Sequence, residues 1–214
     1  MRIIDLSKKL LPGKEHRRLE IKKFIFDPGE IMHYIETESH IGTHVEAPSH
    51  FIPAKYGKPA KDISQMHLKK FIGKAVLIDL SSAKKMKILT PEDINVEIRD
   101  DDIVLFGNSS HEEQDRPQLS HELIKWLVDM KIKMVGIDDS VRLGPRPPIV
   151  PKALEEMIDH DLFLKNEIPI IEQLTNLDKI SRKRFLFIGF PLNIVGLDST
   201  PIRAVAIEDY STQF

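Results

Sequence analysis

The 214-residue chain contains no cysteine. Disulfide bonds and thiolate metal sites are therefore excluded, so any metal ligands must come from nitrogen and oxygen donors. The absence of cysteine also fits a reducing compartment, and we expect a cytoplasmic protein.

The chain also lacks a charge excess and a long apolar run. Its 31 Lys and Arg face 33 Asp and Glu, which gives a formal net charge of −2, so we expect neither a nucleic acid nor a membrane partner. The most apolar stretch (185–197) is shorter than the roughly 20 residues of a membrane-spanning helix. The opening residues MRIIDLSKKLLPG have no signal-peptide pattern. We expect a single domain over residues 1–214, large enough to bury about 70% of its unfolded surface.

Hydrophobic periodicity predicts strands in the first third and helices later. Predicted strands include LEIKKFIF, IMHYIETES, KFIGKAVLIDL with a turn at Gly73, DDIVLFG, MVGIDD, IPIIEQL, FLFIGFPL and IRAVAIED. Helices are predicted from Thr90, which starts a capping box, from Ser120 and from Pro151. This order favours a mixed α/β fold over a regular βαβ series.

The segment HIGTHVEAPSHF (40–51) gathers three of the nine histidines around one glutamate. His40, His44, Glu46 and His50 all occupy even positions, so an extended strand would place them on one face. The odd positions are mostly apolar or β-branched and suit the buried face. A helix fits less well, because Glu46 would lie about 200° from His44.

Distance decides whether this strand can bind a metal. In a straight strand the Cα atoms of His40 and His44 would lie about 13 Å apart, at the limit for two ligands of one ion. A bend at Gly42 would bring them closer, because glycine adopts conformations that other residues avoid. With Glu46 they supply three ligands and leave a position for water, so we predict a divalent metal site. Nitrogen and oxygen donors favour zinc, with manganese as the alternative.

Two further residues extend this site. His50 is too far along a strand to join the same ion, but Pro48 could redirect the chain and place His50 beside the metal as an acid–base catalyst. Glu172 lies inside the apolar run IPIIEQL. A carboxylate in a buried strand is costly unless it is paired or bound to a metal, which supports Glu172 as a ligand.

The segment reads H-x-G-T-H-x-(D/E)-x-P-x-H-F and resembles the signature of the cyclase family of metal-dependent hydrolases. That family includes bacterial kynurenine formamidases and isatin hydrolases. Other segments, such as FIGKAVLIDLS and FPLNIVGLDSTPIRAVAI, follow in the order expected for the family. The resemblance implies a strand-rich α/β domain of the swivelling β/β/α type and a homodimer or homotetramer.

The resemblance also implies site residues, position by position. His50 matches the proton-transfer histidine. The implied metal ligands are His40, His44, Glu46, His160 and Glu172. The family usually has aspartate where this chain has Glu46, and the extra methylene reaches roughly 1.3 Å further. Whether one or two ions bind therefore stays open.

The implied activity is hydrolysis of a small amide by a metal-bound hydroxide. The substrate would be an arylformamide such as N-formylkynurenine, or a cyclic amide. Residues 138–142, Asp-Asp-Ser-Val-Arg, replace a Thr-Pro-Ser stretch typical of kynurenine formamidases, so the exact substrate stays open. Arg142 and Arg146 could bind a carboxylate or be solvated loop charges, and no substrate-binding residue is assigned. The alternatives are a non-enzymatic metal- or ligand-binding protein and a metal-dependent lyase on the same scaffold.

Overall fold

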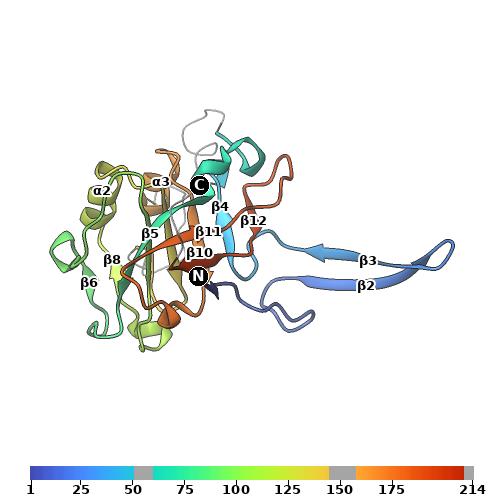
Figure 1. Cartoon of the computed structure of the whole chain (residues 1–214), viewed down its shortest axis with the longest axis horizontal. Helices are drawn as coiled ribbons and strands as arrows, with labels where there is room; N and C mark the ends of the chain where they lie inside the picture. The colour runs from blue at the N-terminus through green and yellow to red at the C-terminus, as the bar shows by residue number, and fades with distance from the viewer. Residues whose placement is uncertain (51–59, 145–157, 210–214) are drawn as a thin grey trace.

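A curled sheet forms the centre of the molecule (Figure 1). The computed structural model describes residues 1–50, 60–144 and 158–209, and in these ranges the sheet has nine strands in the order β1-β13-β11-β5-β7-β9-β10-β4-β12. The strands are β1 (Arg2–Asp5), β4 (His44–Glu46), β5 (Ile72–Asp79), β7 (Ile103–Gly107), β9 (Met134–Asp138), β10 (Ile170–Leu174), β11 (Arg184–Ile188), β12 (Ser199–Pro201) and β13 (Val205–Glu208). The pairs within β5-β7-β9-β10 are parallel and the other pairs are antiparallel, so the sheet is mixed as expected.

Helices cover one face of this sheet. Helix α2 (His121–Asp129) follows Ser120, the predicted start, and the Ser120 hydroxyl accepts a hydrogen bond from the Leu123 amide as the N-cap. Helix α3 (Ile158–Leu164) is the described part of the helix predicted from Pro151, whose predicted start lies outside the described residues. Buried side chains of both helices pack on alternate residues of the parallel strands.

A second core lies on the opposite face of the sheet. It joins Ile103, Leu105 and Ile171 of the central strands to Phe185 and Phe187 of β11. Burying a side chain of this size stabilises the fold by about 1.5–3 kcal/mol. The two cores together fix the sheet on which the histidine segment lies.

One antiparallel hairpin projects from the body (Figure 1). It consists of β2 (Leu19–Phe26) and β3 (Glu30–Thr37), and every residue of β3 is exposed. Both strands were predicted. A smaller parallel pair joins β6 (Ile88–Leu89) to β8 (Gln118–Leu119). In the described part of the chain, no helix is both long and apolar enough to cross a membrane.

Two local predictions were wrong. The turn expected at Gly73 does not occur, because β5 runs through Gly73 and pairs it with Phe187. A Cβ at Gly73 would lie 2.7 Å from Lys133 Nζ, so the missing side chain makes room for that lysine. The capping box at Thr90 is present but begins only the short 3-10 turn Pro91–Asp93.

Candidate metal centre

The strand β4 brings the predicted ligands together. It lies between β10 and β12, and its antiparallel register sets His44 opposite Glu172 and Glu46 opposite Ile170. Opposite residues of an antiparallel pair point to the same face, so His44 and Glu172 converge. This is a long-range pairing between two segments that the sequence pattern could not place side by side.

The histidine segment is a strand over only three residues. Gly42 has a φ of +55°, which bends the chain between His40 and His44 as anticipated. A Cβ at Gly42 would come within 2.5 Å of the Leu10 side chain. After β4, residues Pro48–His50 form a 3-10 turn, so the proline does redirect the chain. Both departures from a straight strand turn His40 and His50 towards Glu46.

An irregularity in β10 sets the position of Glu172. The register with β9 shifts between Ile171 and Leu174, and Gln173 has a φ of +59°. The hydroxyl of Thr43 donates to the Gln173 carbonyl at 2.6 Å, which supports this conformation. Such bulges re-aim side chains next to functional sites.

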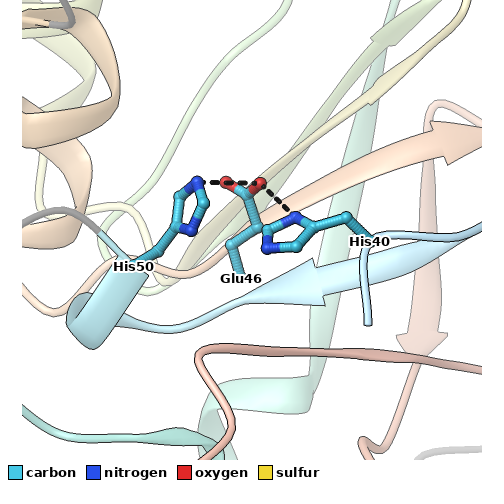
Figure 2. Close-up of side chains that lie close together, drawn as sticks. All are labelled: His40, Glu46 and His50. Carbon is cyan, nitrogen blue, oxygen red and sulfur yellow. Dashed lines mark ion pairs between the residues drawn. The ribbon is translucent and has the colours of Figure 1, made fainter. Parts of the chain in front are cut away.

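Glu46 is the centre of the cluster. Its Oε1 lies 3.1 Å from His40 Nδ1, 3.6 Å from His50 Nε2 and 3.8 Å from His44 Nε2 (Figure 2 shows the first two contacts). The Glu46 side chain is only 3% exposed. One buried carboxylate oxygen therefore faces three imidazole rings.

Glu172 links the cluster to the helical layer. Its Oε2 lies 3.8 Å from His44 Nε2 and its Oε1 lies 3.6 Å from His160 Nε2 of α3. All six residues predicted for the site are therefore brought together. The donor atoms fall into two overlapping sets, each within 4.8 Å: His40 with Glu46 and His50, and His44 with Glu46 and Glu172.

The donor chemistry of this cluster fits a divalent cation. His44 Nδ1 lies 2.8 Å from the Gly42 carbonyl, which can only accept, so Nδ1 carries the proton and Nε2 presents its lone pair to the cluster. Among the described residues, His44 Nε2 and Glu46 Oε2 are buried without a hydrogen-bond partner. Buried polar atoms are rarely left this way unless something else binds them. A metal held by imidazole and carboxylate would satisfy both.

The pKa shifts indicate that the imidazoles and carboxylates of the site stabilise one another's charged forms. Burial opposes protonation of His40, but Glu46 and Asp198 outweigh it and raise the pKa of His40. Burial also opposes ionisation of Glu46, yet the neighbouring imidazoles hold the pKa of its carboxyl well below the usual range. His160 is buried too, and Glu172 raises its pKa. These directions follow from carboxylates and imidazoles gathered in one buried place.

Sequence reasoning missed one member of the cluster. Asp198 precedes β12, and its Oδ2 lies 2.7 Å from His50 Nδ1 and 3.2 Å from His40 Nε2. Arg203, five residues further along the chain, binds Asp5. No local pattern marks Asp198, because its partners lie about 150 positions away in the sequence.

The candidate carboxylate-binding arginines are not part of the cluster as described. Arg142 donates from its guanidinium to the Glu113 carbonyl, which ties it to a neighbouring turn. Arg146 lies outside the described residues. Substrate-binding residues therefore remain unassigned.

The fold and the donor set define a class of protein, a mixed α/β domain with a buried histidine–carboxylate cluster suited to a divalent metal. The model of the family described as "Cyclase" matches residues 4–140, which is more than half of the chain. The chain belongs to this family. The matched range includes the histidine segment, whereas His160 and Glu172 lie beyond it.

Relatives and solved structures agree with this placement. Kynurenine formamidase from Bacillus cereus is 26% identical over 171 residues, covering 78% of this chain and 75% of that protein. Isatin hydrolase A from Labrenzia aggregata has a TM-score of 0.74 and 23% identity, with 96% and 93% of the two chains covered. A predicted metal-dependent hydrolase from Bacillus stearothermophilus has a TM-score of 0.70 and 21% identity, with 96% and 97% covered. The structural likenesses establish the fold.

Proposed function

We propose that this protein is a metal-dependent hydrolase of a small amide, either an arylformamide such as N-formylkynurenine or a cyclic amide. The observation that carries the proposal is the pair of atoms His44 Nε2 and Glu46 Oε2, which are buried without a hydrogen-bond partner among the described residues and belong to a donor set with Glu172. The names of the relatives, kynurenine formamidase and isatin hydrolase, support the reaction class.

The ligands we assign are His40, His44, Glu46, His160 and Glu172. A divalent cation bound there, with zinc favoured over manganese, supplies a Lewis acid that polarises the amide carbonyl and lowers the pKa of water. One or two ions are compatible with the two overlapping donor sets. Glu46 belongs to both sets and is the residue through which they would be coupled.

His50 is the group we assign to proton transfer. Its Nε2 points towards Glu46 at the centre of the cluster (Figure 2). From there it would accept a proton from the attacking water and return it to the leaving nitrogen. Positioned acid–base groups of this kind contribute about 10²–10⁴-fold to the rate.

Two histidine variants test these assignments. His50→Ala should retain bound zinc but lose about 10²–10⁴-fold in hydrolysis of N-formyl amides and isatin. His44→Ala should lose the zinc itself. His33→Ala, on the exposed hairpin, is the matched control and should change neither property. If His50→Ala hydrolyses these substrates at the wild-type rate, its assignment is wrong.

The reaction type needs its own measurement. Hydrolysis transfers an oxygen atom from solvent to the product, whereas elimination does not. Turnover in ¹⁸O-labelled water should therefore label the carboxylate or formate product. An unlabelled product would favour a lyase, and bound metal without turnover on amides or lactones would favour a binding protein. We further propose that the enzyme works in the cytoplasm on a small-molecule substrate.

A further inference from the structure

The carboxylate of Asp198 completes a cycle of four side chains in which carboxylates and imidazoles alternate. Glu46 Oε1 faces His40 Nδ1 at 3.1 Å, and His40 Nε2 faces Asp198 Oδ2 at 3.2 Å. Asp198 Oδ2 then faces His50 Nδ1 at 2.7 Å, and His50 Nε2 returns to Glu46 Oε1 at 3.6 Å. Each of the two rings thus lies between the same two carboxylates.

The distances decide which nitrogen of His50 carries the proton in the neutral ring. The contact with Asp198 is a short, charge-assisted hydrogen bond, whereas the contact with Glu46 exceeds hydrogen-bond length. The proton therefore resides on Nδ1, and Nε2 keeps its lone pair. If Asp198 were removed, Glu46 would be the remaining one of these two carboxylates beside the His50 imidazole. The proton would then move to Nε2, which faces Glu46.

The position of Asp198 is fixed by the backbone around it. Its own carbonyl accepts the Ala47 amide at 2.8 Å, which ties the residue to the end of β4. Two residues earlier, the Gly196 amide donates to the Asp62 carboxylate at 2.7 Å. The Asp198 side chain is 36% exposed, so it borders the buried cluster without being enclosed in it.

We propose that Asp198 is a positioning residue that holds His50 with Nδ1 protonated and Nε2 unprotonated, and that holds His40 through the same oxygen. A carboxylate behind a histidine selects the tautomer and ring orientation of that histidine. Asp198 would thus prepare His50 Nε2 to accept a proton and would fix the orientation of the His40 ring beside Glu46. The catalytic part of this inference rests on the proposed function, whereas the tautomer does not.

The direct test is ¹⁵N NMR of the histidine rings in the metal-free protein at alkaline pH. Wild-type His50 should be protonated at Nδ1, and Asp198→Ala should shift the proton to Nε2. Asp198→Asn retains an acceptor oxygen and should keep the wild-type tautomer. An unchanged His50 tautomer in Asp198→Ala overturns the proposal.

Zinc titration supplies a second readout. Asp198→Ala should bind zinc about 10–100-fold more weakly, and Asp198→Asn should lose less than this. Asp62→Ala, which frees the Gly196 amide without touching a histidine, is the control for loop loosening. If Asp62→Ala has the same effect as Asp198→Ala, the loop and not the carboxylate is responsible, and the proposal fails. The proposal also fails if Asp198→Asn weakens zinc binding as much as Asp198→Ala does while the His50 tautomer is unchanged. Asp198 would then be a metal ligand.

Kinetic measurements distinguish failure of the positioning proposal for Asp198 from failure of the proposed hydrolase function. With an active wild type, Asp198→Ala should lower kcat more than it raises KM, because His50 acts in the transition state. A kcat equal to wild type would contradict the positioning role. A wild type that hydrolyses no amide, yet shows the predicted tautomers, would refute the proposed function and leave the positioning of the two rings intact.

Discussion

Glu46 shows how a single buried residue organises this site. A carboxylate that is 3% exposed is stable as an anion only if positive or hydrogen-bonding groups surround it. Here the rings of His40, His44 and His50 surround one oxygen, while the second oxygen has no hydrogen-bond partner in the described residues. The unpartnered oxygen is therefore a candidate ligand for a cation.

A second buried carboxylate has a structural role and predicts acid sensitivity. Glu208 accepts the amides of Ser181 and Arg182 at 2.6 and 2.8 Å and the Arg2 guanidinium at 3.0 Å. Burial opposes ionisation, but these donors outweigh it and lower the pKa of Glu208. A lowered folded-state pKa stabilises the fold above the unfolded value, near 4.5, and this stability is lost as the pH falls through the folded value.

Glu208→Gln should therefore cost about 1–3 kcal/mol of unfolding free energy at neutral pH, because hydrogen bonds to a charged acceptor are lost. The difference between wild type and variant should shrink as the pH falls below about 4.5. Urea unfolding at several pH values measures both. Glu122→Gln, on the exposed surface of α2, serves as the control. A pH-independent difference would contradict this account of Glu208.

At the scale of the element, the bend at Gly42 positions His40 and His44 in the candidate metal site. Its φ of +55° is a conformation that costs other residues about 1–2 kcal/mol. Gly42→Ala should destabilise the protein by at least this amount, because the new Cβ would also meet the Leu10 side chain. It should also weaken zinc binding, because the bend sets His40 against His44. Gly13→Ala is a matched control, since Gly13 also has a positive φ and nothing lies near its Cβ position. It should lose stability but bind zinc normally, and equal zinc affinity in both variants would contradict the role of the bend.

Local patterns predicted most elements, because periodicity and capping depend on neighbours in the sequence. The helix at Ser120, both hairpin strands and the central strands were found in this way. Gly73 was misread because its missing side chain makes room for Lys133, which precedes β9, and does not form a turn. The histidine motif was visible because its residues are close in sequence. Asp198 was missed because its role depends on the pairing of β12 with β4, a contact between distant segments.

At the scale of the whole molecule, the β2–β3 hairpin is a candidate interface because it exposes several large apolar side chains. Ile21 pairs with Ile35 and Ile25 pairs with Ile31 on one face, and all four are at least 46% exposed. Phe24 stacks on Tyr34 on the other face. A two-stranded ribbon is marginally stable alone in water. The homodimer or homotetramer implied by the family resemblance remains a prediction, and we propose that the hairpin contributes to it.

Replacing Ile25 with Lys and Ile31 with Glu tests this proposal. The two residues are directly opposite, so the new charges can pair across the ribbon while two of the four exposed isoleucines on this face are removed. We expect the wild type to sediment as a dimer or larger assembly and the double variant to shift towards monomer. The control variant, with Ile25→Val and Ile31→Val, should assemble like the wild type. A monomeric wild type, or an unchanged assembly in the charged variant, would contradict the proposal.

The central claim is that imidazoles and carboxylates from β4, β10 and α3 hold a divalent cation needed for amide hydrolysis. Its most direct test is the metal content and hydrolytic activity of the purified protein before and after chelation. We predict at least one bound ion per chain, loss of activity when it is removed, and recovery when zinc or manganese is returned. Undiminished hydrolysis after complete metal removal would contradict the account.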